Sequence, residues 1–269
     1  MPYRPPRVTV AGLLLAVATG VAGAQSGTAP ADPGRGRGVV VGAGPGGQRQ
    51  ACLACHGLEG RGDPAAGFPR LDGQMATYLY KALADYASGV RPNEIMTPIA
   101  KALTEQQRRD VAVHYATQDP TGPGPTGAAA RPAGGPEDYG LVQRGAVLSS
   151  IGAAEHGVQA CQNCHGPDGA GLAPLVPALA GQHEGYLRGQ LQAWKAGRRG
   201  GDPAGVMAGI ARRMDDRDVS AAARYFASLP PAPRSVSGVA AITAVVPEAA
   251  GNRTAASGAP AGQRQGDRP

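Results

Sequence analysis

The alternation of apolar and polar positions along the chain is that of short amphipathic helices, and these helices come in two similar sets. The spacing of apolar residues predicts one helix over about residues 75–88 and another over about residues 183–196. Their apolar stripes are Tyr78, Leu79, Ala82, Leu83 and Tyr86 in the first, and Tyr186, Leu187, Gln190, Leu191 and Trp194 in the second. Gly89 and Gly197 follow these stripes as stop signals.

A further helix is predicted at the end of each set. Thr104 with Gln107 three residues later has the pattern of a capping box, which places a helix start at Thr104. The matching helix of the second set begins near Asp215. A brief first helix that ends in a cysteine motif completes each set of three. Because no run of useful length alternates with a period of two, we expect an all-α protein.

The two sets are copies of one unit. The stretch "PRLDGQMATYL" at 69–79 matches "PALAGQHEGYL" at 177–187, and residues 95–116 match residues 206–227. The blocks follow in the same order in both copies. We therefore predict two tandem domains of the same fold, over residues 45–120 and 137–230.

The remaining segments are rich in Gly, Pro and Ala. Residues 25–44 are predicted to be a flexible N-terminal segment, residues 121–136 a linker and residues 231–269 a disordered C-terminal tail with one brief apolar stretch around residues 239–246.

The first 24 residues have the pattern of an export signal. Arg4 and Arg7 precede an apolar run that is short for a membrane-spanning helix, and Ala22-Gly23-Ala24 offers a small-residue cleavage site. The alternative is an uncleaved anchor. Both interpretations place the body of the protein outside the cytoplasm, in the periplasm.

Composition and charge narrow the range of possible functions. Aromatic residues make up only 4% of the chain, which is thin for two hydrophobic cores. The net charge of +6 lies outside the two domains, because residues 45–120 carry eight basic and eight acidic residues and residues 137–230 carry nine of each. Neither domain has the basic bias of a nucleic-acid-binding surface.

All four cysteines lie in a repeated motif, Cys-x-x-Cys-His. The motif is formed by Cys52, Cys55 and His56 in the first domain, and by Cys161, Cys164 and His165 in the second. This is the attachment pattern of c-type haem, in which two thiols bond the two vinyl groups and the adjacent imidazole binds iron. A thioredoxin-like site would follow a strand, and a zinc site would need a further ligand pair. We therefore predict two covalent haem c groups, which would also supply the missing apolar cores.

The second axial position of each iron is predicted to be a methionine. Met96 and Met207 occupy matched places before the last helix of each copy, among turn residues. The alternative is that each only fills a gap in the core. The carbonyls of Pro69 and Pro177 are candidates to accept a proton from the ligating histidines. Tyr78 and Tyr186 are candidates to hydrogen-bond a haem propionate, with simple helix packing as the alternative.

The combination of these motifs resembles the two-haem class I cytochromes c of the cytochrome c4 family. The resemblance rests on "CLACHG" and "CQNCHG", the Gly-Gln-x-x-x-Tyr-Leu stretches and "QLQAWKAGRR", and it covers about residues 45–230. It implies one haem per domain with His/Met ligation, through His56 with Met96 and His165 with Met207. The shorter, glycine-rich segment ahead of Cys52 and the C-terminal extension depart from this pattern.

The expected function is periplasmic transfer of single electrons in a respiratory chain, rather than catalysis. Expected partners are periplasmic or membrane-bound redox proteins, such as a quinol-oxidising complex or a terminal oxidase. A loose association of the protein with the membrane is compatible with this expectation. Two alternatives remain. One is the cytochrome subunit of a periplasmic dehydrogenase, and the other is a dihaem peroxidase, which would need an open iron site.

Overall fold

The computed structural model describes residues 29–47, 51–121 and 135–231, together with Met1 and Ile242. Three predicted segments lie mostly outside the described residues. They are the signal peptide (1–24) apart from Met1, the linker (121–136) apart from its ends, and the C-terminal tail (231–269) apart from Pro231 and Ile242.

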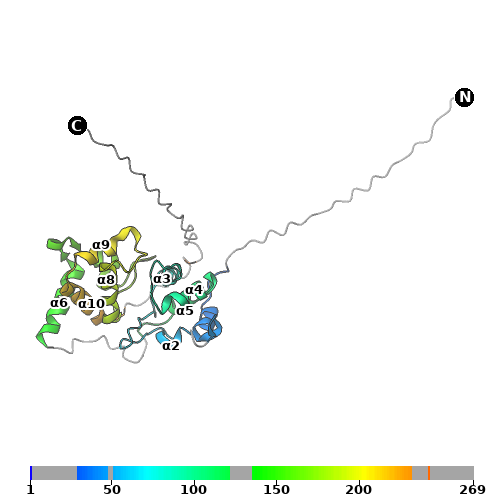
Figure 1. The fold of residues 1–269 in the computed structure, drawn as a ribbon, viewed down its shortest axis with the longest axis horizontal. Helices are drawn as coiled ribbons and strands as arrows, with labels where there is room; N and C mark the ends of the chain where they lie inside the picture. The colour runs from blue at the N-terminus through cyan, green and yellow to red at the C-terminus, as the bar shows by residue number, and fades with distance from the viewer. Residues whose placement is uncertain (2–28, 48–50, 122–134, 232–241, 243–269) are drawn as a thin grey trace, which may run out of the picture.

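The named elements of the first domain are all helices. Its helices, on the right of the folded body in Figure 1, are α1 (Pro33–Gly38), η1 (Val39–Ala43), α2 (Leu53–His56), α3 (Ala76–Ser88), α4 (Met96–Ala102) and α5 (Glu105–Ala116). The capping box predicted at Thr104 is present, since its hydroxyl accepts from the N–H of Gln107 and the Gln107 side chain accepts from the N–H of Thr104.

The second domain repeats this arrangement with a small addition. Its helices are α6 (Pro136–Ser150), η3 (Ala154–His156), α7 (Gln162–His165), η4 (Pro167–Gly169), α8 (Glu184–Lys195), η5 (Pro203–Gly205), α9 (Val206–Arg213) and α10 (Asp216–Ser228). Strands β1 (Gly152–Ala153) and β2 (Val158–Gln159) pair as a short antiparallel ribbon. The all-α prediction is confirmed, with this ribbon as the exception. Helices α1 and α4 in the first domain, and α6 and α9 in the second, are additions to the three predicted per domain.

The segment ahead of the first cysteine motif corrects one prediction. Residues 25–44 are predicted to be flexible, yet residues 33–43 form α1 and η1, and α1 packs against α5 as α6 packs against α10. Arg35 holds α1 in place by a two-pronged ion pair with Asp110, with both N–O distances 2.9 Å. Packing here overrides the low helix propensity of a glycine-rich sequence.

One glycine of α1 and one of α6 serve this packing. At Gly36, a Cβ would collide with the carbonyl oxygen of Asp110, and at Gly145 on α6 with that of Ala221. Gly36 and Gly145 precede the first cysteine of their motifs by the same number of residues. The glycine is therefore required where the two helices of each domain cross.

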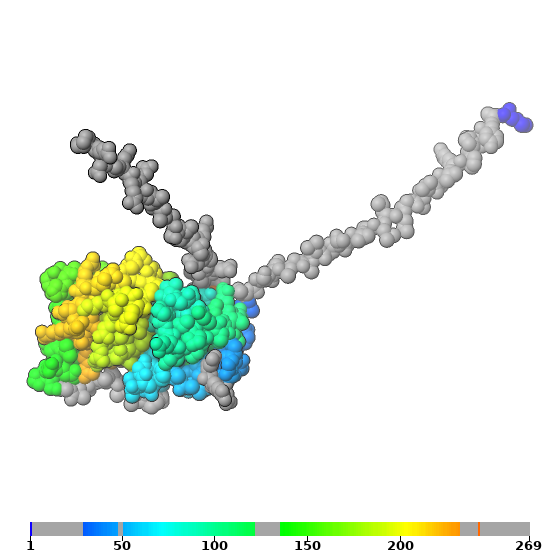
Figure 2. All heavy atoms as spheres, in the orientation of Figure 1, coloured from blue at the N-terminus to red at the C-terminus, as the bar shows by residue number. Residues whose placement is uncertain are grey.

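The two domains pack directly against each other, as the adjoining turquoise (first domain) and yellow (second domain) surfaces in Figure 2 show. Two glutamines cross the boundary in a reciprocal way. The Gln74 side chain bonds both the N–H and the C=O of Ala178 (3.0 Å each), and the Gln182 side chain bonds both of these groups of Arg70 (2.9 Å each). Each amide therefore completes a backbone pair in the other domain. Among the described residues, no helix combines the length and hydropathy that a membrane crossing needs.

Replacing Gly36 with Ala should destabilise the first domain by about 1–3 kcal/mol, because the added methyl group overpacks the crossing with α5. Urea unfolding of the haem-loaded protein, followed by circular dichroism, measures this change. Gly38→Ala is the matched control, since the nearest atom to its new Cβ is 3.8 Å away. Equal stability of the two variants would contradict the proposed role of Gly36.

Candidate functional site

The two cysteine motifs form the same one-turn helix. Helices α2 and α7 run from the residue after the first cysteine to the histidine, and the N–H of His56 and of His165 bonds the carbonyl of the first cysteine at 2.9 Å. Residues separated by three and four positions share one helix face. Both thiols and the imidazole of each motif therefore lie on the same side. Gly57 and Gly166 then turn the chain with φ values of 76° and 74°, which favour glycine.

Each motif histidine is held by one backbone carbonyl. His56 Nδ1 lies 3.0 Å from the carbonyl oxygen of Pro69, and His165 Nδ1 lies 2.8 Å from that of Pro177. A carbonyl can only accept, so Nδ1 carries the proton and Nε2 keeps its lone pair. Burial lowers the pKa of both imidazoles, although the hydrogen bond opposes this effect. Both rings are therefore neutral at pH 7 and can ligate a metal through Nε2.

The first cysteine of each motif is buried. Burial raises the pKa of Cys52 and of Cys161 to about 11. At neutral pH these side chains are thiols rather than thiolates. A low thiol pKa is the mark of a reactive dithiol, so the structure does not favour a thioredoxin-like role.

A cavity of about 290 Å³ opens beside the motif of the first domain. Cys52, Cys55, His56 and Met96 all line it, which places the predicted ligands around one space. Apolar side chains of α3 and α5 form much of its wall, among them Leu79, Leu83 and Val111. The second domain also contributes to the lining, through Pro177, Gln182, Tyr186 and Gln190.

Each predicted axial methionine lies in the first turn of a helix, where a polar side chain accepts from a backbone N–H. The Asn93 side chain accepts from the N–H of Met96 at 2.7 Å, at the start of α4. The Asp202 side chain accepts from the N–H of Ala208 at 2.8 Å, beside Met207 on α9. Both methionines are half-buried. Each methionine therefore lies at the start of the helix that precedes the last helix of its domain.

Two arginines donate hydrogen bonds across the domain boundary. Arg91 of the first domain donates to the hydroxyl of Tyr186 (2.8 Å) and to Gln190 Oε1 (2.6 Å) in the second. Arg199 of the second domain donates to the same Gln190 oxygen (2.6 Å) and to the hydroxyl of Tyr78 (3.3 Å) in the first. One amide oxygen therefore accepts hydrogen bonds from two guanidinium groups.

Each of these guanidiniums also lies over an aromatic ring of its own domain. Arg91 stacks on Tyr86 with 4.5 Å to the ring centroid, and Arg199 stacks on Trp194 at 3.8 Å. Burial would raise the pKa of Tyr78, but the charges of Arg91 and Arg199 outweigh it and hold that pKa below its ordinary value. The cluster is strongly positive, and the side chains at its centre are poorly hydrated.

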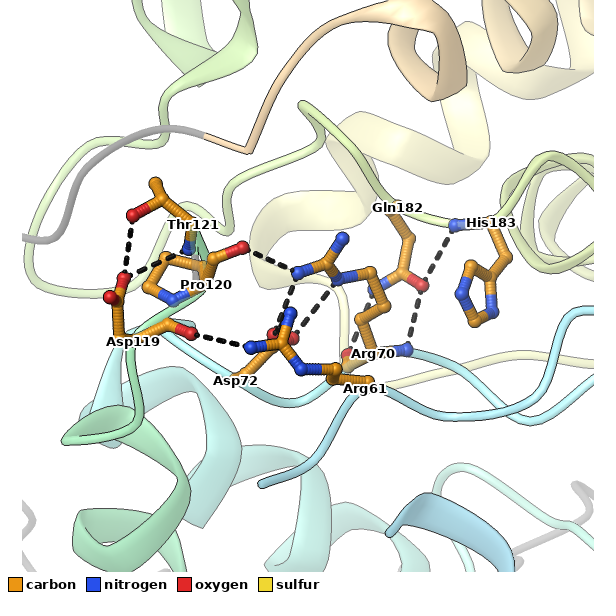
Figure 3. Close-up of polar contacts among 8 residues, drawn as sticks. All are labelled: Arg61, Arg70, Asp72, Asp119, Pro120, Thr121, Gln182 and His183. Carbon is orange, nitrogen blue, oxygen red and sulfur yellow. Dashed lines mark hydrogen bonds and ion pairs between the residues drawn. The ribbon is translucent and has the colours of Figure 1, made fainter. Parts of the chain in front are cut away.

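A second polar group at the boundary surrounds Arg70 and is drawn in Figure 3. Arg70 pairs with buried Asp72 at 2.6 Å and donates to the carbonyl of Pro120 at 2.9 Å, which ties the end of the first domain to the interface. His183, at the start of α8, meets the carbonyl of Phe68 through Nδ1 at 3.0 Å. These contacts assign His183 to domain packing.

Sequence reasoning missed the exchange of arginines. Of two neighbouring arginines after α8, Arg198 is exposed, whereas Arg199 contacts Gln190 and Tyr78. Tyr78 and Tyr186 are placed beside the cavity, where each accepts from an arginine of the other domain. The signal that was available is that Arg91 and Arg199 stand at matched positions, two residues after Gly89 and Gly197.

Comparisons with known proteins agree with the repeat. The sequence profile of the cytochrome c family matches residues 48–118 and 152–230. A thiosulfate dehydrogenase electron acceptor from Thiomonas intermedia is 41% identical over 186 residues, which cover 68% of this chain and 80% of that protein.

Two solved structures share the fold of both domains. Reduced cytochrome c4 from Pseudomonas stutzeri superposes with a TM-score of 0.62 at 30% identity, over 74% of this chain and 99% of that one. A thiosulfate dehydrogenase from Marichromatium purpuratum superposes with a TM-score of 0.63 at 34% identity, over 74% of this chain and 40% of that longer one.

The residues present fit a haem in each domain. The apolar walls of the cavity suit a macrocycle, and His56 offers a free Nε2 beside both thiols. Among the described residues, no carboxylate pairs with Arg91 or Arg199, and the buried Nε atoms of Arg199 and of Trp194 (Nε1) have no hydrogen-bond partner. Such donors suit the propionates of a haem.

From the two attachment motifs, the packing of their domains and these matches, we conclude that the chain belongs to the cytochrome c4 family of class I cytochromes c, and that it is an electron carrier with two covalently bound haem c groups rather than an enzyme.

Proposed function

We propose that this protein is the periplasmic electron acceptor of a dehydrogenase, with a thiosulfate-oxidising enzyme as the first candidate, and that it passes single electrons on through two His/Met-ligated haems. The observation that supports it most is the pair of matched sites packed against each other within one chain. A dehydrogenase removes electrons from its substrate in pairs, and two one-electron centres can take up such a pair. The relative from Thiomonas intermedia carries this role in its name.

Ligation by His56 with Met96 and by His165 with Met207 supports this role. A haem iron with both axial positions filled cycles between ferric and ferrous states without binding substrate, and a methionine ligand raises its potential. Pro69 and Pro177 hold the imidazoles in one tautomer and one orientation through the Nδ1 hydrogen bonds. The ligands therefore need little rearrangement when an electron arrives or leaves.

The cluster at the domain boundary supports electron transfer between the two sites. Arg91 and Arg199 place two positive charges at the domain boundary, beside the cavity of the first domain, where they would hold propionates close to the interface. Tyr78 and Tyr186 fix these guanidiniums from the opposite domain. Tight packing at this boundary keeps the separation of the two sites constant.

The location follows from the N-terminal pattern, which lies outside the described residues. Export places the chain beside enzymes that oxidise small inorganic anions, and beside the membrane-bound redox proteins, such as a terminal oxidase, that would accept its electrons. A peroxidase role is disfavoured because Met96 and Met207 occupy matched positions, so that neither copy lacks a candidate for the second axial ligand.

Met96→Leu and Met207→Leu should each remove one Met–iron bond while leaving the apolar volume filled. In the ferric protein the weak red-edge absorption band of Met–iron haem should fall by about half in each variant and vanish in the double variant, and the potential of the altered haem should fall. Optical spectroscopy with a redox titration measures both. Met75→Leu, which alters a methionine at the domain boundary, is the control, and a full band in the double variant would refute this ligation.

Mixing the oxidised holoprotein with a thiosulfate dehydrogenase and thiosulfate should reduce both haems. Stopped-flow absorbance should show a rate that falls as salt is added if charged surfaces steer the encounter. A cytochrome c with a single haem serves as the comparison acceptor. If this chain is reduced no faster than that acceptor at equal haem concentration, the assignment to this class of dehydrogenase fails.

Gln190→Ala should loosen the domain boundary, because Arg91 and Arg199 both lose the oxygen they share. We expect a loss of about 1–3 kcal/mol in unfolding free energy, the cost of leaving buried donors without a partner. Scanning calorimetry of the holoprotein measures it. Gln192→Ala alters an exposed residue of the same helix and should be neutral, so a similar loss in both variants would argue against a special role for Gln190.

A further inference from the structure

One residue from beyond the second domain is buried in the first. Ile242 follows the end of α10 at Ser228, yet it is 1% exposed and belongs to the hydrophobic cluster of the first domain. That cluster includes Ala76 and Tyr80 on α3 and Val113 on α5. These three residues do not line the cavity beside the cysteine motif, so they form the opposite side of the α3–α5 pair.

The two domains carry different kinds of side chain at this position, apolar in the first and charged in the second. In the aligned repeats, Ala76, Tyr80 and Val113 correspond to Glu184, Arg188 and Arg224 of the second domain. In the second domain the position is closed by ion pairs. Arg224 contacts Glu184 at 2.9 Å and Asp138 at 2.6 Å, and Arg188 contacts Glu184 at 3.7 Å.

In the first domain this position is apolar, so other parts of the chain must shield it from solvent. The exposed fractions of its side chains show that they are shielded. Ala76, Tyr80 and Val113 are 1%, 5% and 0% exposed. In the second domain the first turn of α6, with Asp138, reaches this position. Helix α1 begins at Pro33, much closer to its crossing glycine than α6 does, and so lacks the corresponding turns. Ile242 belongs to the same buried cluster as these three residues.

We propose that the apolar back of the first domain is a docking site for the chain's own C-terminal extension, with Ile242 as the anchor. The chain leaves the second domain at Pro231, which packs against Gly181, and returns to the first domain by Ile242. The domains are therefore joined a second time, in addition to the segment 122–134. A second connection raises the effective concentration of one domain at the other.

This second connection, from Pro231 to Ile242, is called the strap and lies outside the part of the chain that the family profile matches. The cytochrome c profile match ends at residue 230, ahead of the extension. The strap acts on domain packing and not on iron ligation, so its failure and the failure of the proposed electron-transfer role would be seen in different measurements.

Trypsin digestion of the full-length holoprotein tests the anchor. Arg234 lies between Pro231 and Ile242, whereas Arg253 lies beyond the anchor, so cleavage after Arg253 is an internal control. Ile242→Asp should speed cleavage after Arg234 by about tenfold or more, since burial of an Ile side chain stabilises the docked state by at least that factor. Cleavage after Arg253 should not change.

Two further variants separate docking from a general effect of charge. Val245→Asp places the same charge in the same segment and should leave cleavage after Arg234 near the wild-type rate. Tyr80→Arg introduces the residue of the second domain into the docking site and should speed cleavage as Ile242→Asp does. The haem absorption spectrum should be unchanged in all variants. Equal cleavage after Arg234 in Ile242→Asp and wild type, or an equal rise in Val245→Asp, would overturn the proposal.

Discussion

The hydrogen bond from each motif histidine to a proline carbonyl is the interaction on which the function depends. It fixes the Nδ1 proton and turns Nε2 toward the space beside the two thiols, while burial keeps the imidazole neutral. The one-turn helices α2 and α7 can present two sulfurs and an imidazole on one face, but without the carbonyls of Pro69 and Pro177 the ring could rotate. Two such units in one chain form a carrier whose ligands stay in place during electron transfer.

The second constraint is the boundary between the domains. Reciprocal amide contacts from Gln74 and Gln182 and the exchange of Arg91 and Arg199 make each domain part of the other's surroundings. The symmetry is incomplete, because Gln190 has Ala82 as its counterpart in the first copy. One amide therefore serves both guanidiniums, and the two sites are not electrostatically equivalent. Two unequal sites would differ in potential, which suits a carrier that takes an electron at one end and gives it up at the other.

Local patterns in the sequence were sufficient to predict the attachment motifs, the start of α5 and the repeat, because each depends on residues close together in the chain. Helix α1 could not be predicted in this way, since its glycines disfavour a helix until α5 is there to pack against. The partners of Arg91 and Arg199 lie far away in sequence, so only their matched positions hinted at a shared role. Ile242 lies in a tail whose composition indicates disorder, and only the apolar back of the first domain explains its burial.

A spectroelectrochemical titration of the purified holoprotein tests the central claim most directly. The account predicts two one-electron steps per chain, both from low-spin haem with two axial ligands in each oxidation state. Uptake of a single electron per chain, or a high-spin iron in either state, would contradict a carrier built from two closed haem sites.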